Sequence, residues 1–468
     1  MSIRNLDTLF APASVAVFGA SHRASSVGAT VWRNLREGGY QGTLYPVNPK
    51  LDGEIDGVPA YASVRSLPAA PDLAVICTPV DTVVTLIKEL GERGTRAAVV
   101  VTAGMSAEQK QAMLKAARKH TLRILGPNCI GMLVPHLGLN ASFAHIGAQK
   151  GELAFVSQSG ALVTAMLDWA GSRGIGFSHF VSLGEHADVD FGDMLDFLGS
   201  DPKTRAILLY VESIEQPRKF MSAARAAARN KPVIVVKSGR SAAGQQAAAS
   251  HTGALAGSDA VFDAAFARAG MLRVDTLQDL VLAAETLSRF RDGPSGQLIV
   301  LTNGGGAGVM AADAASAEGV PLATLTPDML TRLNAVLPAN WSHANPVDII
   351  GDAPADRYAQ ALEALSQDTD SAILFIHAPT AIVPSTDIAQ TLLPRVSTKP
   401  HRVLGCWLGD QAVANARQLF RSAGVPDFDT PEQAVRALSF LRTYRLHQEE
   451  LMQTPPARTA EQPVGLPL

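Results

Sequence analysis

The stretch SVAVFGASHRASSVG, residues 14–28, joins a β-branched run to a glycine-bearing turn and then to a predicted helix. The same rhythm of short apolar runs and longer Ala- and Leu-rich segments continues through most of the 468 residues. This alternation is typical of βαβ units that form a parallel sheet covered by helices. At about 150 residues per domain, the length favours three such domains. We therefore predict an α/β protein of three doubly wound domains.

Two polar, turn-rich breaks divide the chain, at His145–Gly151 and Arg291–Gly296. They place the predicted domains at residues 1–146, 147–292 and 293–450, and a Pro-rich tail or severed linker at 451–468. The expected strands are Ser14–Gly19, Leu44–Asn48, Leu73–Thr78, Ala97–Thr102, Leu153–Ser157, Ala206–Glu212, Val233–Lys237, Leu298–Thr302, Ala372–His377 and Val403–Leu408.

Composition excludes several classes of protein. The 40 Lys and Arg nearly balance the 43 Asp and Glu, and the net charge of −3 does not favour nucleic acid or an anionic membrane as a partner. The three cysteines lie far apart without a C-x-x-C pair, which argues against disulfides or a thiolate metal site and favours a reducing cytoplasm. We find no signal-peptide run and no stretch of about 20 apolar residues that would span a bilayer.

The first candidate site follows the strand in the opening stretch. Its turn contains Gly19, Ala20 and Ser21, with Gly28 nearby, and a turn of this kind at a helix start presents backbone N–H groups to a phosphate. The next strand ends in PVNPK, with Asn48 and Lys50. A lysine there suits a ligand with a phosphate on its ribose, such as coenzyme A or NADP. The alternative is a structural turn beside an exposed lysine.

Two further strand ends carry small or polar turn residues. Cys77, Thr78 and Pro79 follow one strand, and GPN, residues 126–128, follows another. Ligands of open parallel sheets bind beyond the carboxyl ends of the strands, so Gly126, Pro127 and Asn128 are expected to line the same crevice as the first turn. Cys129 is expected to be a buried apolar residue rather than a nucleophile.

His251 lies in SHTGALAGSD, a run of small residues before a helix that Ser258 or Asp259 can cap. Small neighbours leave the imidazole accessible as a general base or as a nucleophile that forms a covalent intermediate. Glu212 closes an apolar strand and is a candidate to orient that imidazole, although the spacing does not bring the two together. The alternatives are a structural histidine and an ordinary exposed acid.

Two glycine-rich turns open predicted helices and are candidate cradles for a phosphate or a phosphohistidine. One contains Ser159 and Gly160, and the other contains Asn303, Gly304 and Gly305. Because both repeat the order strand, Ser or Thr, glycine turn and helix, the second and third domains are expected to share an architecture. Tight strand–helix packing is the alternative for each turn.

In this order, the pieces VAVFGAS, YPVNPK, LGPNCIG, FVSQSGAL, SLGEHADVD, ILLYVESI, KPVIVVKSGRS, SHTGALAGSD, LTNGGGAGV and NPVDIIGDA resemble the NDP-forming acyl-CoA synthetases, relatives of succinyl-CoA synthetase. The resemblance covers about residues 5 to 450, and SHTGALAG is its most specific part. It implies a CoA-binding Rossmann domain followed by two flavodoxin-like CoA-ligase domains.

The resemblance also implies an activity, that of an acid–thiol ligase of the ADP-forming acetate-CoA ligase type. Acyl-CoA and phosphate would give an acyl phosphate, whose phosphoryl group passes to His251 and then to ADP, with Glu212 bonded to the histidine and Ser159 and Gly160 at the phosphohistidine. CoA is then a substrate, and no tightly bound cofactor or metal is expected on this chain. ADP or ATP with Mg²⁺ would bind an ATP-grasp partner, and an oligomer is expected.

Two features depart from the resemblance. The chain contains no ATP-grasp module, and Glu185 and His186 follow SLG where relatives commonly have Asn. The segment YRLHQEELMQTPP resembles the hinge into a fused ATP-grasp unit. Some longer relatives are Pat-type lysine acetyltransferases with a GNAT domain, in which the synthetase-like part is a regulatory acyl-CoA-binding module. That role is the alternative function, and an NADP-dependent oxidoreductase ranks third.

Overall fold

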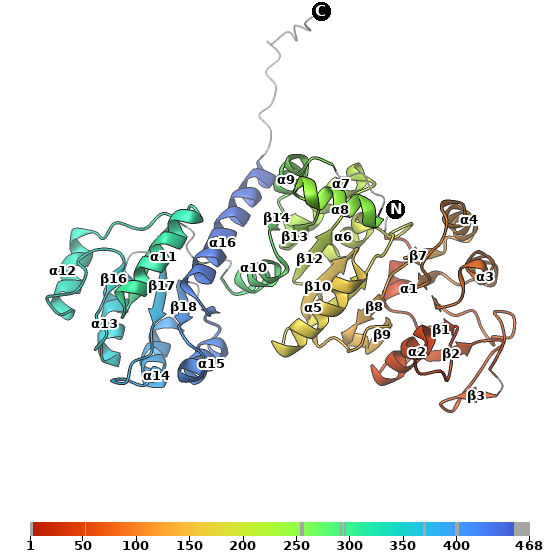
Figure 1. Cartoon of the computed structure of the whole chain (residues 1–468), viewed down its shortest axis with the longest axis horizontal. Helices are drawn as coiled ribbons and strands as arrows, with labels where there is room; N and C mark the ends of the chain where they lie inside the picture. The colour runs from red at the N-terminus through yellow and green to blue at the C-terminus, as the bar shows by residue number, and fades with distance from the viewer. Residues whose placement is uncertain are drawn as a thin grey trace, which may run out of the picture.

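A computed structural model describes residues 3–51, 53–252, 257–290, 293, 296–367, 371–397 and 402–453, with the backbone alone at positions 249, 251, 252, 289 and 290. The chain forms three α/β units in a row, each built on its own parallel sheet (Figure 1). Within the described residues, no helix combines the length and apolar character needed to cross a membrane.

The first unit has a five-stranded parallel sheet flanked by four helices, with a small two-stranded ribbon, β3 (Glu54–Ile55) and β4 (Val58–Pro59), at one side. Its sheet order is β2 (Thr43–Val47), β1 (Ser14–Phe18), β5 (Leu73–Ile76), β6 (Ala97–Val100) and β7 (Arg123–Leu125). Its helices are α1 (Leu6–Phe10), α2 (Val27–Glu37), α3 (Val80–Arg93) and α4 (Ala107–Arg118).

The second unit has a seven-stranded sheet. Its order is β14 (Leu272–Val274), β13 (Val233–Lys237), β12 (Ala206–Val211), β10 (Lys150–Ser157), β11 (Phe177–Ser182), β8 (Gly131–Val134) and β9 (Leu139–Ser142). The hairpin of β8 and β9, with the turn η1 (Pro135–Leu137), joins β11 in antiparallel register, and the other strands are parallel. The helices are α5 (Gly160–Ser172), α6 (Phe191–Ser200), α7 (Pro217–Asn230), α8 (Ala242–Thr252), α9 (Asp259–Arg268) and α10 (Leu277–Phe290).

The third unit has a five-stranded parallel sheet. Its order is β16 (Val347–Asp348), β15 (Gln297–Thr302), β17 (Ser371–His377), β18 (Val403–Trp407) and β19 (Asp427–Phe428). The helices are α11 (Gly305–Ala317), α12 (Pro327–Val336), α13 (Ala355–Leu365), α14 (Ser385–Val396), the turn η2 (Gln411–Val413), α15 (Ala414–Ser422) and α16 (Pro431–Met452).

The five parallel strands of each unit follow one order. When they are numbered along the chain within a unit, that order is 2-1-3-4-5, and the predicted doubly wound fold is confirmed. In such a sheet the order in which successive strands are added reverses between the first and third strands. Ligands bind at this point, beyond the carboxyl ends of the strands. These positions fall between β1 and β5, between β10 and β12, and between β15 and β17.

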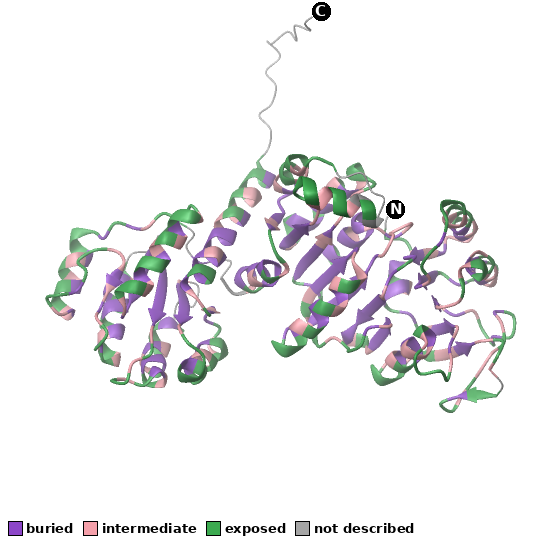
Figure 2. Cartoon of the chain, in the orientation of Figure 1, coloured by how far each residue is buried: buried purple, intermediate pink, exposed green. Residues whose placement is uncertain are grey.

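The strands are buried because helices cover both faces of each sheet. All four residues of β5, of β6 and of β8, and all seven of β17, are buried, and all of these residues except His377 are apolar or small. Figure 2 shows buried strands in all three units with exposed residues on the outer faces of the helices.

The helix α16 lies between the second and third units (Figure 1). It contacts α10 and β14 of one unit and α11 of the other. From it, the Arg436 guanidinium lies 3.3 Å from Asp275 and 3.1 Å from Asp279 in the second unit, and 3.9 Å from Glu318 in the third. The helix α16 extends two residues into the predicted tail at 451–468, since it ends at Met452. Residues 454–468 lie outside the described residues, as does most of the break at 291–296.

Candidate active site

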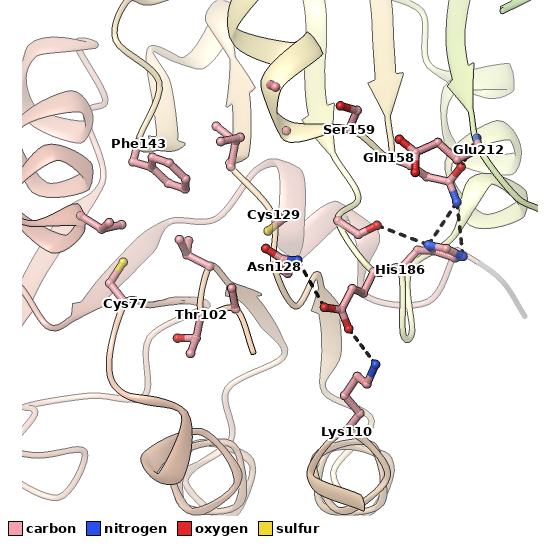
Figure 3. Close-up of a pocket in the computed structure, with 18 of the residues that line it drawn as sticks. Cys77, Thr102, Lys110, Asn128, Cys129, Phe143, Gln158, Ser159, His186 and Glu212 are labelled. Atoms are coloured by element: carbon pink, nitrogen blue, oxygen red, sulfur yellow. Dashed lines mark hydrogen bonds and ion pairs between the residues drawn. The ribbon is translucent and has the colours of Figure 1, made fainter. Parts of the chain in front are cut away.

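A cavity of about 750 Å³ opens where the first and second units meet (Figure 3). It is lined by residues that follow β5, β6 and β7 of the first unit and β10, β11 and β12 of the second. Six predicted site residues line it together, namely Cys77, Thr78, Asn128, Ser159, Gly160 and Glu212. Two doubly wound sheets therefore direct their carboxyl ends into one space.

The predicted turn after β1 borders this cavity at Val27, while Gly19, Ala20, Ser21 and Gly28 are not among its lining residues. Gly19 has φ +93°, and a Cβ at Gly28 would stand 1.9 Å from the Gly19 carbonyl oxygen. These two glycines thus allow α2 to begin directly against the turn. The backbone at the start of α2 is thereby brought close to the strand ends.

The side chain of Asn48 shapes the neighbouring turn. Its Nδ2 donates to the Ala20 carbonyl at 2.8 Å, and its Oδ1 accepts from the Lys50 backbone N–H at 2.9 Å. Lys50 is exposed and lies outside the cavity lining, as do Asn48 and Pro79.

The carbonyls of Gly126 and Pro127 hold a loop of the second unit. Pro127 accepts from the Glu185 N–H at 2.9 Å, and Gly126 accepts from the Ala187 N–H at 3.1 Å. A Cβ at Gly184 would stand 2.3 Å from the Asn128 carbonyl oxygen, so the two loops touch backbone to backbone. This contact joins the two units along one wall of the cavity.

The start of α5 forms another wall. Ser159 is the N-cap residue and makes no side-chain cap, while Ser157 Oγ accepts from the Ser159 N–H at 3.0 Å. Ser159, Gly160 and Ala161 all line the cavity. The first backbone N–H groups of a helix without a side-chain cap are available to an anion, and the helix dipole favours negative charge there.

Gln158 is a site residue that our sequence analysis did not select. It is 7% exposed, and its Oε1 accepts from the N–H groups of Glu212 at 2.6 Å and of Ser213 at 3.1 Å. Its Nε2 donates to the Ser213 carbonyl at 3.1 Å. One amide side chain therefore fixes the end of β12, and Glu212 with it, against the start of α5. A polar residue directly after a buried parallel strand was the signal in the sequence.

The loop after β11 adds two more residues, the pair noted above as a departure from relatives. Glu185 bonds Lys110 Nζ at 2.8 Å and Asn128 Nδ2 at 3.3 Å. The His186 ring lies 3.2 Å from Gln158 Nε2, and Figure 3 shows it beside Gln158 and Glu212, with Cys77 on the opposite side of the view. Both residues line the cavity, and neither was predicted as part of the site.

The two thiols in the cavity wall are poor nucleophiles. Burial raises the pKa of Cys77 to about 12, and burial also raises the pKa of Cys129 to about 12. Both stay neutral thiols near neutral pH. The expectation that Cys129 is a buried apolar residue is confirmed, since it is 3% exposed. Among the described residues no group of three or more His, Cys, Asp or Glu is arranged to hold a metal ion.

The backbone of His251 lies in the last turn of α8, while its side chain and residues 253–256 lie outside the described part of the chain. The predicted next helix begins at Asp259, but its N-cap Ser258 forms no side-chain cap. Asp259 instead pairs with Arg273 at 2.5 Å. Beneath this region Lys237 is 3% exposed, lies 4.6 Å from the Phe262 ring centroid, and has its pKa lowered by burial.

The start of α11 in the third unit repeats the geometry at the start of α5 in the second, but no acid stands at the position that corresponds to Glu212. Thr302 Oγ1 accepts from the Gly304 N–H at 3.1 Å, as Ser157 does for Ser159. Asn303 Oδ1 accepts from the Ala378 N–H at 2.8 Å, in the way that Gln158 holds Glu212. The glycine turn of Asn303, Gly304 and Gly305 opens α11 but does not line the cavity, so the structure does not bring it together with the other site residues.

Comparison with known proteins agrees with this architecture. Three family models match in chain order: a CoA binding domain over residues 13–135, a succinyl-CoA ligase like flavodoxin domain over 150–287, and a ligase-CoA domain over 298–438. Three domains of these kinds in this order place the chain in the class of succinyl-CoA ligase-like proteins.

Similarity to individual relatives identifies the family more closely. The chain is 40% identical to an ADP-forming acetate–CoA ligase I of Archaeoglobus fulgidus over 94% of its own length, and it spans only 64% of that relative. It is 37% identical to the alpha subunit of an ADP-forming acetate–CoA ligase I of Pyrococcus furiosus, over 93% of this chain and 97% of that subunit. The chain belongs to the NDP-forming acyl-CoA synthetase family, and the predicted resemblance is confirmed.

A solved structure is similar over almost the whole chain. It is the acetyl-coenzyme A synthetase 1 of Ca. Korarchaeum cryptofilum in complex with phosphate and ADP, which matches with a TM-score of 0.87 and 35% identity. The match covers 96% of this chain and 98% of that one. The arrangement of all three units is therefore common to both proteins.

Proposed function

We propose that the chain is the α-type subunit, or α-type half, of an ADP-forming acid–thiol ligase. This enzyme interconverts acyl-CoA, ADP and phosphate with a carboxylic acid, CoA and ATP. The observation that carries the proposal is the joint cavity, in which Gln158 holds Glu212 against the uncapped start of α5 beside the strand ends of the first unit. The names of the relatives support this reaction type.

In the proposed first step, phosphate attacks the acyl carbonyl carbon of acyl-CoA, and the C–S bond breaks to release CoA as a thiolate. The reactive end of CoA would enter through the strand ends at Cys77, Thr78 and Asn128, which line the cavity. The turns at Gly19 and Asn48 would hold its phosphates through backbone N–H groups, with the exposed Lys50 at the ribose phosphate.

In the proposed second step, a His251 ring nitrogen attacks phosphorus, and the carboxylate leaves with the electrons of the P–O bond. The helix start at Ser159 and Gly160 would stabilise the charge on the phosphoryl oxygens, because its N–H groups are preorganised and partly shielded from water. The half-buried Glu212 carboxylate would accept a hydrogen bond from the other ring nitrogen and orient the imidazole.

The phosphohistidine would then transfer its phosphoryl group to ADP. That nucleotide, with Mg²⁺, would bind an ATP-grasp partner, either as a separate subunit or as a further part of a fused protein. The glycine turn at Asn303, Gly304 and Gly305 would act as a second cradle for phosphohistidine, since α11 also begins without a side-chain cap. An oligomer that contains both modules follows where the ATP-grasp partner is a separate subunit.

Labelling with phosphate tests the proposal. The purified chain, with and without an ATP-grasp partner, is incubated with labelled inorganic phosphate and acetyl-CoA, and the acid-labile label is mapped at neutral pH. We expect label at His251 that His251→Asn abolishes and Glu212→Gln reduces, while His145→Asn, an exposed histidine outside the cavity lining, leaves it unchanged. Absence of label when the partner is present and CoA is bound would instead favour a regulatory acyl-CoA-binding module.

A further inference from the structure

The lining of the cavity is short of positive charge. Lys110 is its only lysine or arginine among the described lining residues, and it forms an ion pair with Glu185 at 2.8 Å. Glu212 and Glu215 add two further carboxylates. A phosphate that enters beside Glu212 therefore meets negative charge, and a helix start provides only about half an elementary charge against it. His186 is the one other lining side chain that can become a cation.

The position of His186 is well determined by its neighbours. Its side chain is 10% exposed, and Gln158 Nε2 lies 3.2 Å from its Nδ1. Because Gln158 Oε1 already accepts two backbone N–H groups, the amide must present its NH₂ to the ring. The neutral imidazole accepts from this NH₂ at Nδ1 or at Nε2, which lie 3.2 and 3.4 Å from Gln158 Nε2. Its remaining N–H then faces Glu215, 3.6 Å from Nε2, or the Gly184 carbonyl oxygen, 3.3 Å from Nδ1.

The protonated ring also finds partners. With both ring nitrogens protonated, Nδ1 lies 3.3 Å from the Gly184 carbonyl oxygen and Nε2 lies 3.6 Å from the Glu215 carboxylate, and each oxygen can accept one N–H. On its other side the ring borders a small cleft with Asp190, which is neutralised by Lys219 at 2.8 Å. No other charged side chain lines that cleft within the described residues except Glu215.

We propose that His186 is a positioning residue of the phosphoryl-transfer site, which stabilises a bound phosphate with its protonated ring and sets the position of Glu212 through Gln158. This inference rests on the proposed function and adds a residue to it. On protonation, neither ring nitrogen accepts from Gln158, so the amide that holds the Glu212 N–H loses its partner on the ring and keeps only Ser213. The charge of the cavity and the position of its acid are thereby coupled.

Binding of inorganic phosphate tests this role without turnover. The variant His186→Asn removes the titratable ring and suits the backbone, because residue 186 has φ +39° and asparagine tolerates positive φ. We expect the variant to bind phosphate about tenfold more weakly than the wild type at pH 6, as for loss of one nearby positive charge, and equally at pH 8.5. The readout is the ratio of the phosphate dissociation constants of the two proteins at each pH, because phosphate itself titrates in this range.

A second variant and a control complete the design. His186→Lys keeps a cation at all these pH values, so it is expected to retain tight binding at pH 8.5, where the wild type weakens. His145→Asn, an exposed histidine outside the lining, should match the wild type throughout. The same proteins are then labelled with phosphate and acetyl-CoA, and His186→Asn should slow labelling most at low pH.

The outcomes separate this inference from the proposed function. If the ratio of the two dissociation constants depends on pH as expected but the wild type takes no label, the proposed reaction fails and the role of His186 in phosphate binding stands. If label enters His251 and His186→Asn changes neither binding nor the pH profile of labelling, the inference is overturned and the reaction stands. Wild type that binds no phosphate at any pH also overturns it.

Discussion

Two buried titratable groups give the third unit opposite responses to acid. His377 in β17 is fully buried, with Nδ1 bonded to the Tyr358 hydroxyl at 2.9 Å and Nε2 to Ser385 Oγ at 3.0 Å. Burial lowers its pKa from 6.5 to about 4. In β19, burial raises the pKa of Asp427 from 3.8 to about 6, although Arg421 lies 3.0 Å away.

The signs follow from which state binds protons more tightly. Unfolded His377 takes up its proton below pH 6.5 and the folded residue only near pH 4, so its contribution is present above pH 6.5 and lost on acidification. At about 1.4 kcal/mol per pKa unit, the loss between pH 7 and 4 is about 3 kcal/mol. Folded Asp427 binds its proton already near pH 6, whereas the unfolded residue binds it only near pH 3.8. Acidification from pH 7 to 4 therefore adds about 2 kcal/mol to the free energy of unfolding through this residue.

The wild-type contributions therefore nearly cancel, and single substitutions reveal them. We expect Asp427→Asn to make the third unit about 2 kcal/mol more sensitive to acid between pH 7 and 4 than the wild type. His377→Gln should reverse the trend, so that acid stabilises this unit relative to the wild type by about 3 kcal/mol. Both values are differences in unfolding free energy between a variant and the wild type, so the contributions of the other titrating groups, which both proteins share, cancel.

Urea titrations at pH 7, 6, 5 and 4 measure this effect, with pulse hydrogen exchange of peptides from β17 as the readout. Domain-specific exchange is needed because the second unit has its own buried histidine, His179, whose pKa burial lowers to about 4. His343→Gln, an exposed histidine in the same unit, serves as the control. Parallel stability curves for wild type and both variants would refute the reasoning.

Three further predictions concern the site. Gly28→Ala places a Cβ 1.9 Å from the Gly19 carbonyl oxygen, so we expect a loss of about 1–3 kcal/mol in unfolding free energy and weaker CoA binding by calorimetry; unchanged binding would contradict the proposed turn. Gln158→Leu leaves the Glu212 N–H without its acceptor and should cost about 1–3 kcal/mol and most phosphate labelling, whereas full labelling would argue against its positioning role. Cys77 and Cys129 should resist iodoacetamide at pH 8 until urea is added, as mass spectrometry will show.

The regular elements were accessible from sequence because their signals are local. The predicted strand Val233–Lys237 coincides with β13, and the predicted Leu298–Thr302 differs from β15 by one residue. The hairpin of β8 and β9 was missed, since β8 is defined by its pairing with β11, about 48 residues further along the chain, and β9 by its pairing with β8. Hydrophobic periodicity and turn residues indicate a strand, but they do not indicate which strand beyond the next helix it pairs with.

For the site, the residue types at strand ends were predictable and their grouping was not. Glycine turns and polar residues after apolar strands indicated Cys77, Asn128, Ser159 and Glu212, because parallel sheets gather ligand contacts at that edge. The glycine turn of the third unit carries the same local signal, yet it does not line the cavity. Local pattern does not specify how one unit is oriented against the next.

The sequence by itself determined the three doubly wound units, their order and the family, through hydrophobic period and motifs that are each contained in a few adjacent residues. The tertiary structure decided that Gln158 reaches Glu212 across 54 positions and that His186 completes the same cluster. Such contacts depend on distances of about 3 Å between side chains from different loops. Those distances are set by the packing of whole sheets and helices, which no short stretch of sequence encodes.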